Sequence, residues 1–427
     1  MRLLIAVVVA LCGIALPAGA DAQSGPRNCT RTSQNLFVRD VLDEYYLWYR
    51  ELPRLNPSNY ATPEAYLDAA RFRPLDSTFS YITSRAANDA FYGDSQFVGV
   101  GITTQMSGSE MRVLQVFPES PASEAGMARG DRIFEINGTS VTELIETGLI
   151  GGAFGASEPG VTAQVGFQSR QGVERRATLT KRVVTIPTVS LTRTFQVDGR
   201  TVGYLLFRNF VEPSYGALDE AFAALREARA TELVIDLRYN GGGLVDVAVH
   251  LGGLVAGAVT EGRIFATFQH NDKHSALNED LRFERPTQSL NLSRLFVVTT
   301  RASASASELL INSLRPHIPV FVIGDATYGK PVGQYGFAFC DKVLAPVAFA
   351  LVNSDGQGDF FGGIAPTCAA PDDLEHDLGA ADEASLAEAF HLLRTGTCSA
   401  PATAQRLRVR ATTPPRAIGW QSVVNAH

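Results

Sequence analysis

The second half of the chain holds a cluster of serines followed by a lysine and a glutamine, and these residue types can carry out nucleophilic catalysis. The stretch VVTTRASASASELLINSLRPHIPVFVIGDATYGKPVGQ spans residues 297–334. A serine hydroxyl becomes a good nucleophile when a neighbouring base takes its proton, and a buried lysine can be that base because burial lowers its pKa. Arginine cannot replace it, since its pKa stays far above neutrality. The candidate pair is therefore Lys330 with Ser303, Ser305 or Ser307.

The predicted elements around these residues would bring them to one site. The apolar run 296–299 predicts a buried strand, the small residues of 302–306 predict a tight turn, and a helix is expected to begin at Ser307. Such a turn exposes a hydroxyl beside unpaired backbone N–H groups at the positive end of the helix dipole. A second apolar strand, 320–323, leads into the glycine-flanked loop that carries Lys330.

The motif SASE followed by YGKxxxQ resembles the carboxyl-terminal processing (tail-specific) serine peptidases, which use a Ser-Lys dyad completed by a glutamine. In that family the nucleophile is the first serine of SASE, and the lysine follows 25 residues later, which is the interval between Ser305 and Lys330. The resemblance implies that Ser305 is the nucleophile, Lys330 the base and Gln334 the third member. Ser307 is then expected to serve as the N-cap of the helix.

The C-terminal half alternates strand patterns with helix patterns. Strands are expected over 201–210 and 232–238, and helices over 215–230 and from Leu244 onward. This alternation predicts an α/β core with parallel strand pairing. The family resemblance implies that the core is a crotonase/ClpP-like Ser-Lys peptidase domain, for which we predict the bounds 184–398.

The turn DLRYNGGG follows the second of these strands. It matches neither the GxGxxG nor the Walker A pattern, so a nucleotide site is not predicted. The family resemblance implies that this turn supplies one oxyanion-hole amide, from Gly242 or alternatively Gly241, and that Ala306 supplies the other. Glycine suits this role because the backbone must approach the scissile carbonyl without a Cβ in the way. Asp236 and Arg238 are expected to hold the loop in place.

The segments FVGVGI, MRVLQVFPESPASEAGMARGDRIFEINGTSV and VTAQVGF, between residues 97 and 167, resemble a PDZ domain in its circularly permuted bacterial form. We predict such a β-domain over 91–183. In PDZ domains, backbone amides cradle the C-terminal carboxylate of a peptide, which adds as a strand to a sheet edge. Carried over to this chain, the cradle consists of Gly99, Val100, Gly101 and Ile102.

An alternative is a degenerate PDZ domain that only packs against the α/β core. Many members of the resembled family carry an arginine near the Gly-Thr turn after the second PDZ helix, and in some it helps to align the active site. The corresponding stretch here, GGAFGASEPGVTAQV, has no arginine. The sequence therefore does not support this form of regulation.

Residues 23–90 are predicted to form an N-terminal helical segment. The stretch SQNLFVRDVLDEYYLWYREL carries a broad apolar stripe at helical spacing, and TPEAYLDAARF opens with a helix start signal. Aromatic stripes of this kind are usually packing surfaces, so no ligand is predicted there. The stripe consists of Leu36, Val38, Val41, Leu42, Tyr45, Tyr46 and Trp48.

The first 22 residues predict a cleavable signal peptide, with cleavage after Ala20 or Ala22. Their apolar stretch is shorter than the ~20 residues that span a bilayer. We therefore expect a periplasmic or secreted protein without a membrane span. The formal net charge of -7 argues against nucleic acid as a partner. A C-terminal tail over 399–427 has weak patterning and is expected to be partly disordered or to attach to the surface.

Four cysteines remain after the predicted leader: Cys29, Cys340, Cys368 and Cys398. In an oxidising compartment an even number suggests disulfides, and we expect Cys340 with Cys368, since both flank one β-rich segment, and Cys29 with Cys398. The alternative is four reduced, buried thiols. No cysteine or histidine cluster has metal-ligand spacing, so neither a metal nor another cofactor is predicted.

These observations predict an exported serine endopeptidase of the C-terminal processing type. It would cleave unfolded or C-terminal segments of proteins. The PDZ resemblance implies that these protein or peptide substrates are recognised through their C-termini, and the protein could form oligomers. A Ser-His-Asp triad is not expected, because the chain lacks a Gly-x-Ser-x-Gly elbow. The alternatives are a catalytically silent periplasmic peptide-binding protein with the same fold, and hydrolysis of a non-peptide ester or amide by the same dyad.

Overall fold

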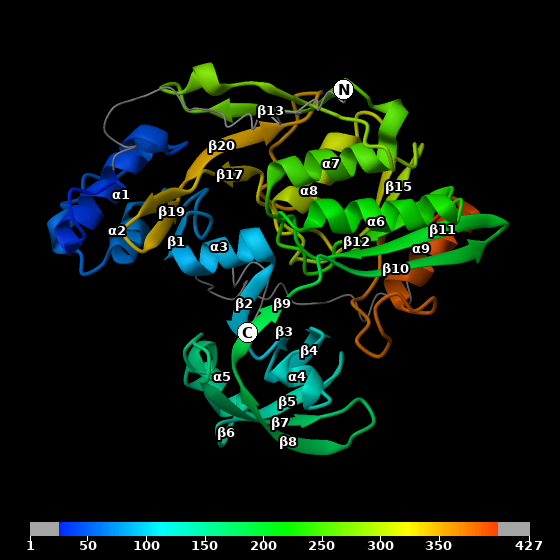
Figure 1. Cartoon of the computed structure of the whole chain (residues 1–427), viewed down its shortest axis with the longest axis horizontal. Helices are drawn as coiled ribbons and strands as arrows, with labels where there is room; N and C mark the ends of the chain where they lie inside the picture. Colours follow the sequence, from blue (N-terminus) through cyan, green and yellow to red (C-terminus); the bar gives the residue numbers. More distant parts are fainter. Residues whose placement is uncertain (1–24, 400–427) are drawn as a thin grey trace, which may run out of the picture.

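The computed structural model describes residues 25–399, which form an N-terminal segment, a small β domain and an α/β core (Figure 1). The predicted signal peptide over 1–22 lies outside the described residues, and so does the predicted tail apart from Ser399. Within the described part of the chain, no helix has the length and apolar character needed to cross a membrane.

The α/β core is built on a six-stranded sheet whose central strands run parallel, as the alternating pattern predicts. The first strand pairs antiparallel with the second, and the short last strand is parallel to its neighbour. The two central strands are buried along their whole length, which explains their continuous apolar sequence. In order across the sheet, the strands are β10 (Val189–Val197), β11 (Arg200–Phe207), β12 (Glu232–Asp236), β15 (Leu295–Thr299), β16 (Val320–Gly324) and β21 (Cys368–Ala369).

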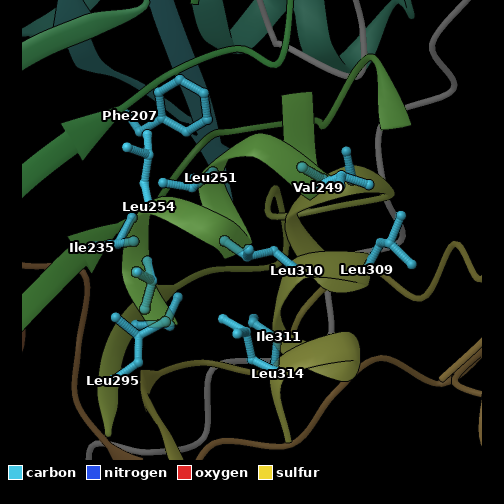
Figure 2. Packing of buried hydrophobic residues seen from close by; sticks show 14 of the residues in the cluster. Phe207, Ile235, Val249, Leu251, Leu254, Leu295, Leu309, Leu310, Ile311 and Leu314 are labelled. Carbon is cyan, nitrogen blue, oxygen red and sulfur yellow. The ribbon is translucent and has the colours of Figure 1, made fainter. Parts of the chain in front are cut away.

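Helices cover both faces of this sheet. On one face lie α6 (Ser214–Glu227), α7 (Val245–Ala256) and α8 (Ala306–Leu314), and on the other lies α9 (Ala384–Thr395). Strand residues alternate between the two faces, so Ile235 packs in the cluster with α7 and α8, whereas its neighbour Val234 packs with α9. Figure 2 shows the interior on the α7 and α8 side, where aliphatic side chains from strands and helices meet.

Two smaller sheets extend the core toward the N-terminal segment. One has the order β14–β13–β20–β17 and is antiparallel, and the other has the order β1–β19–β18. The strand β1 comes from the N-terminal segment, so that segment adds a strand to a sheet of the core. The bounds are β14 (Asp280–Arg282), β13 (Ile264–His270), β20 (Val347–Val352), β17 (Val332–Gln334), β1 (Tyr81–Ser84), β19 (Lys342–Ala345) and β18 (Phe337–Phe339).

The N-terminal segment contains α1 (Arg31–Tyr45), α2 (Pro63–Ala70) and α3 (Arg85–Asp94). The predicted helix over 33–52 is too long, because α1 ends at Tyr45 and the next residue has an extended backbone. Beyond Tyr45 the chain bonds other segments: the Leu47 N–H donates to the Val347 carbonyl at 2.9 Å, and the fully buried Tyr46 donates its hydroxyl to the Asp76 carboxylate. In addition, short 3-10 helices are present at Tyr49–Glu51, Pro57–Asn59, Ile150–Gly152, Gly257–Val259 and Ser275–Leu277.

The small β domain has its own sheet and its own apolar core. The chain enters and leaves it through β2 (Gln96–Gly99) and β9 (Arg182–Thr185), which pair antiparallel as a two-stranded stem. Its sheet has the order β3–β4–β5–β7–β8, with β6 beside β5, and its helices α4 and α5 are short. The bounds are β3 (Ile102–Ser107), β4 (Glu110–Val116), α4 (Pro121–Glu124), β5 (Arg132–Ile136), β6 (Thr139–Ser140), α5 (Val141–Glu146), β7 (Thr162–Gln168) and β8 (Glu174–Thr180).

Two disulfides are present, but the predicted pairing is wrong. The bonds join Cys29 to Cys340 and Cys368 to Cys398. Cys340 lies in the turn between β18 and β19, whereas Cys368 lies in β21 of the six-stranded sheet, so the two are in different sheets. The first bond ties the start of α1 to the core, and the second ties the end of α9 to the sheet it covers.

Candidate active site

The strand-to-helix turn predicted around Ser305 is present, and it holds this residue in a rare backbone conformation. Ser305 precedes α8 and has a φ of 54°. A positive φ in a residue with a Cβ costs on the order of 1–3 kcal/mol, so the surroundings must enforce it. The Gly-rich loop packs directly on the turn, since a Cβ on Gly242 would lie 2.7 Å from both Ser305 Cβ and the Ala306 nitrogen. Glycine is therefore required at 242 by the close approach of the two loops.

Of the first two candidate serines, only one can reach a substrate. Ser303 is fully buried, and its hydroxyl donates to the Leu237 carbonyl at 2.7 Å. Ser305 is partly exposed and lines a cavity. Burial and hydrogen bonding hold Ser303 in a structural role, which leaves Ser305 as the accessible hydroxyl.

Ser307 does not cap the helix, so that prediction is wrong. The helix α8 begins at Ala306, one residue earlier than expected, and Ser305 occupies the N-cap position. Ser307 is fully buried in the first turn, and its hydroxyl donates to the Asn240 carbonyl at 3.0 Å. It therefore fastens the helix start to the Gly-rich loop.

A buried carboxylate that the sequence analysis did not single out connects the serine turn to the lysine loop. Glu308 is fully buried and accepts hydrogen bonds from the backbone nitrogens of Ser305 (2.9 Å), Gly329 (2.7 Å) and Lys330 (2.8 Å). It also accepts the hydroxyl of Thr327 at 2.5 Å. Burial raises the pKa of Glu308, while these four hydrogen bonds favour its charged form. The sequence signal that could have identified Glu308 is its place in the motif SASE, where an acidic residue falls in the first turn of the predicted helix.

The lysine and the glutamine of the motif are in direct contact. Lys330 Nζ donates to Gln334 Oε1 at 3.0 Å, and Gln334 Nε2 donates to the Phe79 carbonyl at 2.7 Å. Burial lowers the pKa of Lys330 to about 8, although the negative charges of Asp76 and Glu308 oppose this shift. The amine is therefore a base that is largely neutral in mildly alkaline solution.

Ser305, Lys330 and Gln334 all line one cavity of about 350 Å³. No histidine is among the described residues that line it. Within residues 25–399, the hydrogen-bond partner of Lys330 Nζ is Gln334, and a bond to the Ser305 hydroxyl is not formed in this arrangement. Catalytic hydrogen bonds are often longer in unliganded enzymes and shorten when substrate binds. The apolar part of the lining includes Leu244, Val245, Leu309, Phe349, Leu351 and Phe360.

The residues predicted to form an oxyanion hole lie beside the serine. Ala306 is the first residue of α8, where backbone N–H groups lack intrahelical partners. The Gly242 nitrogen donates to Asn240 Oδ1 at 2.9 Å, so in this arrangement its N–H is occupied. The next residue, Gly243, lines the cavity, whereas Gly241 does not. The Gly-rich loop thus approaches the site with Gly243 at the cavity wall and Gly242 behind it.

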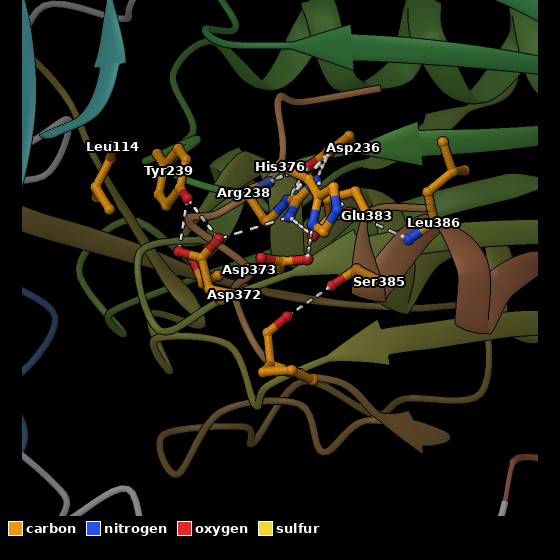
Figure 3. Close-up of polar contacts among 12 residues, drawn as sticks. Leu114, Asp236, Arg238, Tyr239, Asp372, Asp373, His376, Glu383, Ser385 and Leu386 are labelled. Atoms are coloured by element: carbon orange, nitrogen blue, oxygen red, sulfur yellow. Dashed lines mark hydrogen bonds and ion pairs between the residues drawn. The ribbon is translucent and has the colours of Figure 1, made fainter. Parts of the chain in front are cut away.

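The residues that precede the Gly-rich loop belong to a buried ionic network (Figure 3). Arg238 and Asp236 are fully buried, and the guanidinium bonds both the Asp236 carboxylate and Glu383 Oε1, the latter at 2.6 Å. The hydroxyl of Tyr239 donates to the Asp372 carboxylate at 2.6 Å. Neither Asp236 nor Arg238 lines the cavity, which fits the structural role expected for them.

An arginine of the β domain reaches the same network, from a position that the sequence analysis did not consider. Arg129 donates to the Tyr239 hydroxyl at 2.7 Å, to Asp372 Oδ1 at 2.7 Å and to the Leu114 carbonyl at 2.8 Å. The stretch that lacks an arginine, 151–165, lies elsewhere in the β domain. The domain therefore contacts the residue next to the Gly-rich loop through Arg129.

The predicted peptide cradle lies at the start of the β-domain sheet. Gly99 ends β2, Val100 is fully buried, and Ile102 begins β3 and is also fully buried. Gly101 has a φ of 88° and faces Ser120, whose Cβ would lie 2.1 Å from a Cβ at this position. Within the described residues β3 pairs only with β4, so no strand is paired with its other edge. Its first three residues, 102–104, are buried.

A metal site is not indicated by the side chains that the structure places together. Within residues 25–399, the group of potential ligands that lies close enough for a metal consists of Cys368, Glu388 and Cys398. Its two cysteines form a disulfide with each other and cannot act as thiolate ligands. The Glu388 carboxylate accepts hydrogen bonds from Ser399.

Comparison with known proteins gives three family models along the chain. The model of peptidase family S41 matches residues 201–370, that of the peptidase S41 N-terminal domain matches 33–81, and that of the PDZ domain matches 112–148. The PDZ match covers part of the β domain, and the S41 match includes the serine turn, the lysine loop and the Gly-rich loop.

Among curated relatives, a carboxyl-terminal-processing protease of Synechocystis sp. is 25% identical over 269 residues, covering 62% of this chain and 60% of that protein. A carboxy-terminal-processing protease of Bartonella bacilliformis is 27% identical over 278 residues, covering 61% and 60%. The chain thus spans about 60% of the length of these relatives.

Among solved structures, the crystal structure of an S41 protease from Bacteroides fragilis is similar with a TM-score of 0.67 and 26% identity, covering 84% of this chain and 97% of that one. The photosystem II D1 C-terminal processing protease has a TM-score of 0.50 and 22% identity, covering 79% and 92%. The second similarity concerns the fold alone.

Proposed function

Because this chain belongs to peptidase family S41, with the N-terminal domain of that family and a PDZ domain in the same chain, we propose that it is a serine endopeptidase of the C-terminal processing type. Ser305 would be the nucleophile, Lys330 the general base and Gln334 the residue that orients the base. The substrates would be unfolded or C-terminal segments of proteins. No cofactor takes part in this proposal.

One observation carries the proposal. Ser305 is the accessible serine of its turn, and it shares a cavity with a lysine whose amine is bonded to Gln334 and whose pKa burial lowers to about 8. Nucleophile, base and orienting group are the three parts that a covalent hydrolytic mechanism needs. A catalytically silent binding protein would have no need for a desolvated lysine in the same cavity as a partly exposed serine.

In the first step, the neutral Lys330 amine takes the proton from the Ser305 hydroxyl while the hydroxyl oxygen attacks the carbonyl carbon of a peptide bond. The tetrahedral intermediate carries negative charge on the former carbonyl oxygen. The Ala306 N–H, at the positive end of α8, supports this charge, and Gly242 would do so after exchanging its bond to Asn240 for one to the oxyanion.

In the second step, the protonated Lys330 gives its proton to the departing amine as the carbon–nitrogen bond breaks, which leaves an acyl ester on Ser305. A water molecule, deprotonated by the same amine, then attacks the ester carbonyl. Release of the carboxylic acid product restores the serine hydroxyl when Lys330 returns the proton. The pair acts as a unit, so removing either member should abolish the reaction.

Substrate selection is proposed to involve two places. The cavity wall formed by Leu309, Phe349 and Phe360 favours an apolar substrate side chain next to the bond that is cut. The edge of β3 that has no paired strand among the described residues would allow a substrate C-terminus to add as a strand, with its carboxylate at the cradle of 99–102. The first place would set the cleavage site, and the second would select the chain end.

We also propose that the mature protein works outside the cytoplasm, in the periplasm or as a secreted protein. Two disulfides support this proposal, because such bonds form and persist in oxidising compartments. The predicted leader over 1–22 is consistent with export, and N-terminal sequencing of the secreted chain would test cleavage after Ala20 or Ala22.

The test of the activity is digestion of an unfolded model protein by the purified mature chain, beside Ser305→Ala and Lys330→Ala. We expect the parent to cut and both variants to be inactive, with product ends identified by mass spectrometry. If the parent leaves the substrate intact while still binding it, the peptide-binding alternative gains support. If Lys330→Ala retains activity, the proposed base is wrong.

A further inference from the structure

A buried carboxylate of the N-terminal segment organises a turn that touches the site. Asp76 is fully buried. Its Oδ1 accepts the backbone N–H groups of Phe79 and Ser80, both at 2.9 Å, and its Oδ2 accepts the hydroxyls of Ser80 at 2.5 Å and Tyr46 at 2.9 Å. Four donors therefore converge on one side chain, and they fix the backbone of 76–80 in a single conformation.

This turn determines which end of the Gln334 amide faces Lys330. The Phe79 carbonyl can only accept a hydrogen bond, so Gln334 must direct its Nε2 toward it, and the two atoms lie 2.7 Å apart. The opposite end of the amide, Oε1, then faces Lys330 Nζ at 3.0 Å. A neutral amine has two N–H groups and one lone pair, so an N–H given to Gln334 restricts where the lone pair can point.

We propose that Asp76 is a positioning residue of the Ser-Lys site, which acts by holding the Phe79 carbonyl against Gln334 and by placing a negative charge near Lys330. The inference rests on the proposed roles of Lys330 and Gln334 and adds a residue from another segment of the chain. Asp76 does not line the cavity, so it acts through its neighbours and does not touch substrate.

The electrostatic effect of Asp76 on Lys330 can be measured, because few charged groups act on this amine. Two carboxylates act electrostatically on the amine, Asp76 from the N-terminal segment and Glu308 from α8, and both oppose the lowering of the Lys330 pKa by burial. The other partners of Asp76 are the hydroxyls of Tyr46 and Ser80 and two backbone amides, all neutral. Burial, with Asp76 beside it, raises the pKa of Tyr46 well above its ordinary value, so it stays protonated. Removing the Asp76 charge alone should therefore make the lysine easier to deprotonate.

The first experiment measures the Lys330 titration without relying on activity. The chain has only the lysines Lys181, Lys273, Lys330 and Lys342, so NMR of protein labelled with 13C at lysine Cε gives few signals, and Lys330→Ala identifies the one of interest. In Asp76→Asn, which is isosteric and can still accept the two amide hydrogen bonds, we expect the Lys330 titration midpoint to fall. A midpoint equal to that of the parent would overturn the proposal.

Glu232→Gln is the matched control. Glu232 is another buried carboxylate of the protein, paired with Arg294 at 2.5 Å, and it lies at the end of β12 that is farther from the Gly-rich loop. This variant loses a charge of the same kind and should leave the Lys330 midpoint unchanged. A shift equal to that of Asp76→Asn would mean that any lost carboxylate acts on Lys330, and the proposal would fail.

The second experiment tests whether Asp76 acts through Gln334. We expect Asp76→Ala to lower kcat about 10- to 100-fold with little change in KM, as for a displaced catalytic group. In a Gln334→Ala background, measured above the Lys330 titration midpoint so that the lost charge no longer changes the protonation of the base, the same substitution should change kcat by less than about twofold, because the contact it supports is gone. Equal fold losses in both backgrounds would contradict the proposal. Circular dichroism checks the fold, and Asp76→Asn replaces Asp76→Ala if the latter unfolds.

If the parent chain cleaves nothing, the proposed function fails, but the titration still decides the proposal about Asp76. If the parent cleaves and the midpoint of Asp76→Asn is unchanged, the proposed function stands and the proposal about Asp76 fails.

Discussion

The N-terminal segment and the β domain both flank the α/β core, but they are joined to it by different kinds of contact (Figure 1). Residues of α1 and α2 share one apolar cluster with Val332, Phe339, Leu344 and Val347 of the core. The rings of Phe37 and Phe339 lie 5.1 Å apart between centroids, and the Cys29 disulfide closes the same junction. The N-terminal segment is thus part of the core's interior.

The β domain has a separate apolar cluster, made only of residues between 100 and 179. Its contacts with the core are largely ion pairs, among them Arg129 with Asp372, Arg112 with Glu375 and Arg170 with Asp377. In the part of the chain that the structure describes, an apolar cluster of six buried residues around the stem joins the β domain to the core. Such a junction resembles a transient interface between domains.

The difference shows which part of the chain builds the candidate site. The N-terminal segment supplies the Phe79 carbonyl and Asp76 from within a continuous core, so the site is complete only when that segment is folded. The β domain reaches the site through Arg129 and Tyr239, at the back of the Gly-rich loop. We infer that the β domain can loosen while Lys330 and Gln334 stay in place.

The largest expected effect comes from removing a ring in each apolar cluster. Phe37 is 5% exposed and Phe167, in the β domain, is 1% exposed. Either change to alanine should lower the free energy of unfolding of its own unit by about 3–5 kcal/mol. Activity toward a short fluorogenic peptide is followed during urea unfolding of each variant. We expect Phe37→Ala to lose this activity at lower urea concentrations than the parent, and Phe167→Ala to keep the parent's activity profile.

The matched pair carries its own control, because both substitutions remove the same atoms from buried positions. If Phe167→Ala inactivates the protein toward short peptides as strongly as Phe37→Ala does, the β domain is not an independent unit. The comparison of the two junctions would then be wrong.

The next effect concerns the buried arginine of the β-domain junction. Arg129 is 7% exposed and its partner Asp372 is also largely buried. Arg129→Met removes the closer of the two cations of that carboxylate and leaves Arg238, whose Nη1 lies 3.5 Å from Asp372 Oδ1. Because one partner remains, the loss should cost about 2 kcal/mol of junction stability, less than a buried pair that loses its only partner. Limited proteolysis of the stem around β2 and β9 should become faster. Unchanged proteolysis would show that the apolar cluster alone holds the domain.

Much of the fold and several parts of the site follow from local patterns in the sequence. The strands before Ser305 and Lys330, the Gly-rich turn and the alternation of the core are properties of short windows, where hydrophobic period and turn residues decide the structure. The structure gathers Ser305, Lys330 and Gln334 around one cavity. Gly242 shows the same logic, since a close approach of two backbones requires glycine.

The features that the sequence did not predict depend on contacts between distant segments. Cys29 and Cys340 are 311 residues apart, and no local pattern relates them. In the sequence Asp76 is an ordinary turn residue, and only the structure shows the four donors that converge on it, one of them the Tyr46 hydroxyl just after the end of α1. Arg129 lies in a motif typical of PDZ domains, where nothing marks it as a contact to the core.

A third prediction concerns pH. The proposed base is neutral Lys330, whose pKa burial lowers to about 8. Below that pH, kcat/KM should rise about tenfold per pH unit, and above it the rate should level off. The unfolded chain binds this proton with an ordinary lysine pKa of about 10.4, so the same group makes the free energy of unfolding increase with pH between about 8 and 10.4.

The pH profile also distinguishes the effect of the N-terminal segment on Lys330 from that of the β domain. Asp76 and Glu308 are the charged groups that act on Lys330, and neither belongs to the β domain. The midpoint for Arg129→Met should therefore equal that of the parent, even if its rate is lower. A displaced midpoint in this variant would mean that the β domain controls the charge environment of the base.

The smallest expected effect is at an exposed ion pair of the same β-domain junction. Arg170 and Asp377 lie 2.9 Å apart, but the Asp377 side chain is 74% exposed. Solvent and salt screen such a pair, so Asp377→Ala should cost less than about 1 kcal/mol and should not alter cleavage of short peptides. Proteolysis of the stem, followed as for Arg129→Met, measures this directly. An effect as large as that of Arg129→Met would mean that the junction is held by its surface charges as a whole, and that burial of one arginine does not explain its strength.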